Sequence, residues 1–117
     1  MDPKLKTMTN KIRSEPLRKK VAELLTNPTF EADGKKFTGL PLKTAPAGLS
    51  HHHCYTGGYI EHVASTLNIA LAMCDSVENV YKGKVNRDLV TAGVLLHDAF
   101  KPATYVEREN GGYSPAR

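Results

Sequence analysis

The chain has 117 residues, of which 40% are hydrophobic and 24% are charged, and its formal net charge is +4. This composition is ordinary for one globular domain with one core, and it excludes a disordered chain. No apolar run approaches the roughly 18 residues that a membrane-spanning helix needs. The basic start, MDPKLKTMTNKIRSEPLRKK, lacks the apolar segment of a secretory signal. The sequence therefore predicts a cytoplasmic protein with no membrane segment.

Much of the positive charge lies before residue 44, in RKK at 18–20, GKK at 34–36 and scattered lysines. Such charges can steer phosphate-bearing ligands from a distance. Ordinary solvated helix surfaces carry similar charge, and the alternation of aromatic and basic residues found in single-strand-binding proteins is absent. RNA as a partner is therefore left open by the charge alone.

The first predicted helix covers residues 14–26, SEPLRKKVAELLT. Ser14 is a suitable N-cap, and Pro16 lies in the first turn, where a missing N–H costs nothing. The apolar positions of one helical face are Leu17, Val21, Leu24 and Leu25. Asn27-Pro28 is expected to end the helix.

Residues 27–50, NPTFEADGKKFTGLPLKTAPAGLS, are rich in glycine and proline and predict a long loop. The Asp33-Gly34 dipeptide favours a short hairpin within it. A loop of this length in a small domain is usually functional or disordered.

The longest predicted helix covers residues 58–81, GYIEHVASTLNIALAMCDSVENVY. Spacings of three and four give it a continuous apolar stripe made of Val63, Leu67, Ala70, Cys74, Val77 and Tyr81. The following KGK predicts a turn. Cys54 and Cys74, the only cysteines, form no CxxC motif, so we interpret them as buried, reduced thiols.

A third helix is predicted for residues 87–98, with Asn86 as its N-cap and Asp88 in its first turn. Its inner face is expected to carry Leu89, Val90, Gly93, Val94 and His97. Gly93 lowers helix propensity by roughly 1 kcal/mol relative to alanine, and a close helix crossing would explain it. Pro102 is expected to close the helix, and the residues from Thr104 predict a hairpin with its turn at 110–112.

Two histidines and an aspartate stand where two of these helices meet. His62 lies near the start of the long helix, and His97 and Asp98 end the next one. Antiparallel helices joined by a short turn bring these ends side by side, so the two imidazoles can meet. Two imidazoles and a carboxylate suit Fe, Mn, Zn or Co better than Mg or Ca. Such an ion activates water and polarises a phosphoryl oxygen, and Lys101 could neutralise a bound phosphate.

Each of these features also has a structural interpretation. A lone buried histidine is more often a hydrogen-bonded core residue, and a lysine such as Lys101 most often completes a helix end as a solvated cation. The histidine run 51–53 is equally consistent with a solvated turn, and Gly57-Gly58 with a helix start. The features are harder to dismiss jointly than one by one.

HHHCYTGGYIEH at 51–62, followed by NRDLVTAGVLLHDAFKP at 86–102, resembles the HD-domain metal-dependent phosphohydrolases. These families carry an H…HD…D pattern, often with a lysine in HD-x-G-K. The resemblance covers residues 46–106 and points to an archaeal branch that includes dihydroneopterin cyclic-phosphate phosphodiesterases. It implies an all-α, HD-type helical bundle with a small β-hairpin near the C-terminus. Residues 1–117 would then be the front part of a single HD-like domain.

The resemblance also assigns roles by position. The ligands of a divalent metal would be His62, His97 and Asp98. The groups that bind the substrate phosphate would be His52, His53 and Lys101, and His53 and Lys101 would also act in catalysis. Glu61, which precedes the first ligand, would contact the ligands without binding the metal itself.

Two positions depart from the family pattern. Phe100 replaces the glycine of HD-x-G-K, so the turn cannot rely on glycine. No aspartate follows Asp98, and the only later side-chain carboxylates are Glu107 and Glu109. The closing ligand therefore belongs to a longer chain, comes from a partner, or is missing from a degenerate site. The interrupted hairpin favours the first of these.

The expected function is hydrolysis of a nucleotide-like or cyclic phosphate ester by a divalent-metal phosphohydrolase or phosphodiesterase. The alternative is a non-catalytic, degenerate HD module that binds a nucleotide or RNA through its basic surface. Binding by such a module ignores chelators and weakens with salt. A structural zinc site using Cys54 and Cys74 fits no closed zinc pattern. A homo-oligomer is left open.

Overall fold

The computed structural model describes residues 1–38, 40–48, 54–107, 109 and 113–115. Four α-helices lie within these residues: α1 (Pro3–Thr9), α2 (Glu15–Thr26), α3 (Gly58–Asn79) and α4 (Arg87–Leu96). The described chain also holds a 3₁₀ helix, η1 (Lys101–Thr104), and two antiparallel hairpins, which pair β1 (Phe30–Ala32) with β2 (Lys35–Phe37) and β3 (Tyr105–Glu107) with β4 (Tyr113–Pro115). The predicted helical fold with a small hairpin near the C-terminus is confirmed.

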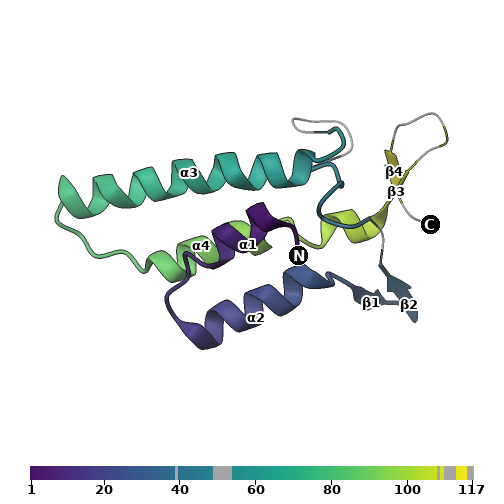
Figure 1. Ribbon diagram of the computed structural model, residues 1–117, viewed down its shortest axis with the longest axis horizontal. Coiled ribbons are helices and arrows are strands. Elements are labelled where there is room, and N and C mark those ends of the chain that lie inside the picture. The colour runs from purple at the N-terminus through teal and green to yellow at the C-terminus, as the bar shows by residue number, and fades with distance from the viewer. Residues whose placement is uncertain (39, 49–53, 108, 110–112, 116–117) are drawn as a thin grey trace.

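The helices α3 and α4 run antiparallel and are joined by residues 80–86 (Figure 1). The helix α2 contacts α4, and α1 lies against all three other helices (Figure 1). The antiparallel arrangement brings the start of α3 beside the end of α4. None of the helices in the described part of the chain is long and apolar enough to span a bilayer.

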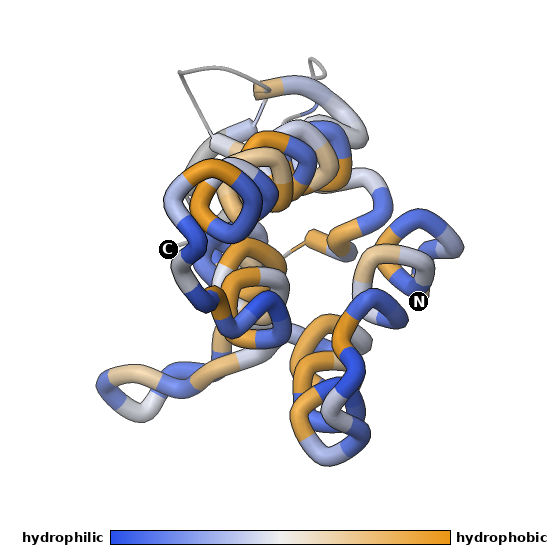
Figure 2. The backbone as a smooth tube through the Cα atoms, turned by 90° about the vertical axis from the view of Figure 1, so that its left-hand side faces the viewer, coloured by the Kyte–Doolittle hydropathy of each residue, from blue (hydrophilic) through white to orange (hydrophobic). Residues whose placement is uncertain are grey.

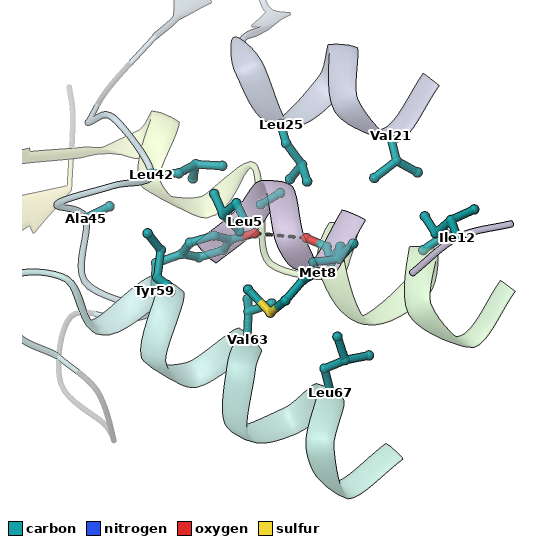
Figure 3. Packing of buried hydrophobic residues seen from close by; sticks show 14 residues of the cluster. Leu5, Met8, Ile12, Val21, Leu25, Leu42, Ala45, Tyr59, Val63 and Leu67 are labelled. Carbon is teal, nitrogen blue, oxygen red and sulfur yellow. Dashed lines mark hydrogen bonds between the residues drawn. The ribbon is translucent and has the colours of Figure 1, made fainter. Parts of the chain in front are cut away.

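The core lies between the four helices, where hydrophobic positions gather (Figure 2). Its large members, each at most 7% exposed, are Leu5, Met8, Ile12, Val21, Leu25, Leu42, Tyr59, Ile60, Val63, Leu67 and Leu95. Figure 3 shows the side chains of α1, α2 and α3 meeting around the ring of Tyr59. Burial of such side chains contributes roughly 1.5–3 kcal/mol each before the entropy of ordering them is subtracted.

The first predicted helix begins at residue 14, but the structure has an earlier one, α1. Asp2 caps it, because its carboxylate accepts the N–H of Lys4 at 2.8 Å, and Pro3 occupies the first helical position. Leu5 and Met8 are buried on its inner face. The short helix is therefore stable because it packs on the other three.

The prediction for α2 is confirmed. Ser14 caps the helix, since its hydroxyl accepts the N–H of Leu17 at 3.5 Å, and the helix ends at Thr26, just before Asn27-Pro28. Val21 and Leu25 are the buried members of its predicted face.

The segment after α2 is more ordered than a long loop. The hairpin predicted at Asp33-Gly34 is present, with both turn residues at positive φ, and Phe30 stacks on Phe37 across it. Farther along, Leu42, Ala45 and Pro46 are buried in the domain. This segment therefore supplies part of the core.

The prediction for α3 is right over most of its length. Val63, Leu67 and Cys74 are buried, but the helix ends at Asn79, and Val77 and Tyr81 are exposed. The apolar stripe is exposed there because the C-terminal end of α3 extends past the helices that cover the remainder of α3 (Figure 1). Cys54 is also exposed, which corrects the prediction that both thiols are buried.

The predicted inner face of α4 is wrong in part: Val94 is half-buried and packs against the core, but Leu89, Gly93 and His97 are exposed. The buried residues are Thr91, Ala92 and Leu95. No atom of the described residues lies within 4 Å of a Cβ built on Gly93, so no close crossing explains this glycine. The sequence RDLVTAGVLL is apolar nearly all round, so its periodicity does not select the buried face.

Candidate metal centre

His62, His97 and Asp98 lie together at the end of the bundle where α3 begins and α4 ends. One potential ligand atom from each residue lies within 4.8 Å of the other two. The two imidazole ring centroids are 5.7 Å apart. The structure thus brings together the three residues that the antiparallel helices were expected to join.

Asp98 is the central member of this group. Its Oδ2 lies 3.1 Å from Nε2 of His97 and 3.5 Å from Nε2 of His62. Its Oδ1 lies 3.0 Å from Nζ of Lys101. Its side chain is only 17% exposed. In this largely buried carboxylate, one oxygen faces two imidazoles and the other faces an ammonium.

A backbone contact sets the tautomer of His97. Its Nδ1 lies 2.6 Å from the carbonyl oxygen of Val94. Because a carbonyl can only accept, Nδ1 carries the hydrogen, and the neutral ring keeps its lone pair on Nε2. Metal-binding histidines commonly use such a contact to orient the ring. No sequence signal marks the Val94 carbonyl, since every residue has one.

The geometry fits a bound cation. The lone pairs of His97 Nε2 and Asp98 Oδ2, 3.1 Å apart, repel each other unless a proton or metal ion lies near both. Atoms that share one ion at about 2.1 Å lie roughly 3–4 Å apart, and the distances from Asp98 Oδ2 to the imidazoles match that spacing. Two imidazoles and a carboxylate therefore fit a divalent metal, and three protein ligands leave positions for water or substrate.

The start of α3 fixes where His62 stands. Gly57, the N-cap, has φ of +80°, a conformation that favours glycine. Its N–H donates to the carbonyl of Thr44 at 2.8 Å, and its carbonyl accepts the N–H of Glu61 at 3.3 Å. His62 then follows in the second turn. The orientation of the helix start is therefore fixed by its contact with the loop that precedes it.

Lys101 follows one turn after Asp98 and begins η1. Its backbone N–H donates to the backbone carbonyl of Asp98 at 3.2 Å, and its ammonium forms an ion pair with Oδ1 of the same residue. The lysine expected to face phosphate thus also contacts a candidate metal ligand. Phe100, which stands in place of the family glycine, is half-buried and packs against the core.

The remaining candidate residues are the histidine run 51–53 and Glu61. His51, His52 and His53 fall outside the described residues. A hydrogen bond with Glu61 raises the pKa of the Tyr55 phenol, so Glu61 is engaged with the segment before α3.

A further link that the sequence does not signal joins this segment to the C-terminal hairpin. The hydroxyl of Tyr113 in β4 lies 2.6 Å from Oγ1 of Thr56. The hydrogen bond therefore links the hairpin to the turn that precedes α3.

The HD domain family model matches residues 59–115. The dihydroneopterin 2′,3′-cyclic phosphate phosphodiesterase of Methanocaldococcus jannaschii is 46% identical over 106 residues, which make up 91% of this chain and 43% of that protein. The 3′–5′ exoribonuclease YhaM of Oceanobacillus iheyensis is 32% identical over 105 residues, which cover 80% of this chain and 32% of that protein. YhaM of Listeria welshimeri is 45% identical over 56 residues, which cover 48% of this chain and 16% of that protein.

The chain spans less than half the length of these curated relatives. No solved structure matches it significantly. The match of the family model includes His62, His97 and Asp98, and the relatives include the archaeal phosphodiesterase branch that the sequence motifs indicate. The resemblance is therefore confirmed, and the chain belongs to the HD domain family.

Proposed function

We propose that this chain forms the metal-binding part of a divalent-metal phosphodiesterase acting on a cyclic or nucleotide-like phosphate ester. The observation that carries the proposal is the convergence of His62, His97 and Asp98, with Oδ2 of Asp98 facing both imidazoles. The relatives support this reaction class, since one is named for a cyclic phosphate diester and others for RNA cleavage.

Each ligand has a defined part in the proposal. His62 contributes Nε2 from α3, while His97 contributes Nε2 from the end of α4 in the tautomer set by the Val94 carbonyl. Asp98 contributes Oδ2. By ligand chemistry the ion is Fe, Mn, Zn or Co. When bound, such an ion lowers the pKa of water toward about 7 and withdraws charge from a phosphoryl oxygen.

Lys101 has two tasks in this proposal. By holding Oδ1 of Asp98 it keeps Oδ2 turned toward the imidazoles. Its side chain is 57% exposed, so its positive charge also lies where a substrate phosphate approaches. His52 and His53 stay predicted phosphate contacts, with a predicted catalytic role for His53.

We further propose that residues 1–117 are the front part of a single HD domain whose remaining ligands lie elsewhere in the protein. The greater length of the relatives supports this, because the chain covers 43% of the archaeal phosphodiesterase. A cytoplasmic location stays a prediction, and a homo-oligomer stays open.

Hydrolysis of 2′,3′-cyclic AMP, followed by chromatography, tests the proposed function. Protein stripped of metal and supplied with Mn²⁺ should hydrolyse the ester, and excess chelator should abolish the activity. His97→Ala should lose both the metal and hydrolysis while circular dichroism shows intact helices, because this side chain is largely at the surface. Hydrolysis retained in H97A would contradict the proposal. Nucleotide or RNA binding that ignores chelators and weakens with salt would instead support the non-catalytic module.

Two lysines provide a matched test of the phosphate contact. Lys101→Met should lower kcat at least about tenfold, because loss of one such charge-stabilising group costs up to roughly 10²–10³. Lys84→Met removes an exposed lysine from the loop between α3 and α4 and should leave kcat unchanged. Equal activities in K101M and K84M would remove Lys101 from the proposed chemistry.

A further inference from the structure

Tyr59 joins α3 to α4 directly beneath the metal centre. It is the second residue of α3 and is 0% exposed. Its hydroxyl donates to the backbone carbonyl of Leu95 at 2.9 Å, and its backbone N–H donates to the carbonyl of Ala45, also at 2.9 Å. Figure 3 shows the ring crossing the core, with its hydrogen bond dashed. The side chain is therefore fixed at both ends.

The acceptor is a carbonyl that an isolated helix would leave unpaired. The last four carbonyls of an α-helix have no intrahelical donor, and Leu95 is the penultimate residue of α4. The next suitable N–H, that of Ala99, donates to Leu96 instead. The Tyr59 hydroxyl thus satisfies a buried helix end that has few other donors within reach.

This hydrogen bond lies within one helical turn of the ligands on both helices. His62 follows Tyr59 by three residues, and His97 follows Leu95 by two. Burial raises the pKa of the Tyr59 phenol, and the negative charge of Asp98 acts in the same direction, so the hydroxyl stays protonated and keeps donating. The contact therefore fixes the rotation and height of α3 relative to α4 at the level of the metal ligands.

We infer that Tyr59 is a positioning residue of the metal centre, because its hydroxyl sets the separation of His62 from His97 and Asp98. The inference rests on the proposed metal-binding function and adds a residue that contributes no ligand atom. Phenylalanine would fill nearly the same volume, so the hydrogen bond can be removed with little change in packing.

Co²⁺ titration, read from its visible absorption bands, tests the inference. Tyr59→Phe should bind Co²⁺ about 10- to 100-fold more weakly than the wild-type chain, as is typical when an outer contact of a metal site is lost. The altered bands should report a changed ligand geometry. Val21→Ala is the matched control, because it truncates a buried core residue on α2 and should leave Co²⁺ affinity within about twofold of wild type.

Three outcomes separate the possibilities. Wild-type affinity and spectrum in Y59F would overturn the inference and leave the proposed metal site standing. An equal loss in Y59F and V21A would also overturn it, because general destabilisation would then explain both. No Co²⁺ binding by the wild-type chain would overturn the proposed function, and the inference with it.

A second variant covers the case in which Y59F does not fold. Tyr59→4-aminophenylalanine keeps the ring and replaces the O–H donor by an N–H donor. It should bind Co²⁺ within about threefold of wild type, since the donor is the feature that matters. Affinity reduced tenfold or more in this folded variant would overturn the inference.

Discussion

The two ends of the α3–α4 pair are held together by different forces. At the end that carries the candidate metal ligands, Tyr59, Val63 and Leu95 are all 0% exposed and pack into one core. At the opposite end, residues 69–89, most of the large apolar side chains are exposed, although Leu71 packs against the core. The exposed ones are Ile69, Met73, Val77, Val80, Tyr81 and Leu89. We call the first the site end and the second the loop end.

Polar contacts follow the same division. At the loop end, the Arg87 guanidinium donates to Asp75 at 2.6 Å and to Glu78 through Nε at 2.7 Å. Ion pairs in contact with water contribute little and are screened by salt. At the site end, the Tyr59 hydroxyl makes its hydrogen bond inside the core. Buried packing therefore fixes the helices where the ligands must be placed within a few tenths of an ångström, and the loop end tolerates change.

Two leucines on the same helix test this comparison with the largest expected effect. Leu95→Ala should lower the free energy of unfolding by about 2–5 kcal/mol, because it leaves a cavity at a 0% exposed position. Leu89→Ala, the matched control at a 60% exposed position of α4, should change it by less than about 0.5 kcal/mol. Urea unfolding measures both. Similar losses in the two variants would mean that the loop end is also buried in solution.

Asp88 sharpens the comparison, since it is a strong polar link at the loop end. Its two carboxylate oxygens accept the N–H groups of Arg13 and Ser14, each at 2.8 Å, just before α2. These bonds, that of Arg13 first, hold the pKa of Asp88 below its usual range. The stability they provide is fully present above about pH 4 and is lost as the pH falls through the lowered pKa.

Asp88→Asn should therefore lower Tm at pH 7, and the difference from wild type should shrink below about pH 4. Asp75→Asn is the control, because it removes the same charge from the same end without breaking a backbone contact. Thermal unfolding between pH 3 and pH 7 checks both variants. A constant difference for D88N across this range would show that the charge of Asp88 does not hold the start of α2.

Gly93 lies between the two ends and should give the smallest effect. Because no atom of the described residues lies within 4 Å of an added Cβ, Gly93→Ala should meet no clash. The helix propensity of alanine should raise the free energy of unfolding by about 0.5–1 kcal/mol, measured by urea unfolding. Destabilisation would indicate a partner packed closely on this face of α4.

The site could be predicted from the sequence more completely than its surroundings. Helical spacing and antiparallel pairing placed His62 beside His97 and Asp98, because helix length and a short connecting loop can both be recognised in the sequence. The Tyr59 hydrogen bond could not be predicted, since it depends on the rotation of α3 against α4. The contact of His97 with the Val94 carbonyl could not be predicted either, since it depends on the side-chain rotamer that His97 adopts at the end of α4. The sequence also does not specify how α4 is rotated about its own axis, which explains why Leu89 was assigned to its inner face.

The fold shows a similar limit at its N-terminus. Asp2-Pro3 is a capping signal for α1, and Leu5 and Met8 have helical spacing. Lys4 and Lys6 make this segment basic, however, and no helix was predicted there. A helix this short gains its stability from the core it joins, and the sequence alone does not locate that core.

Metal analysis of chelator-treated protein that has been reloaded with Mn²⁺ and desalted tests the central claim most directly. The wild-type chain should retain about one equivalent, and Asp98→Asn should retain almost none, because a ligand that faces both imidazoles is weakened. Asp75→Asn, an exposed carboxylate changed in the same way, should match wild type. A wild-type chain without bound metal, or equal metal in D98N, would contradict the assignment of His62, His97 and Asp98 as a metal centre.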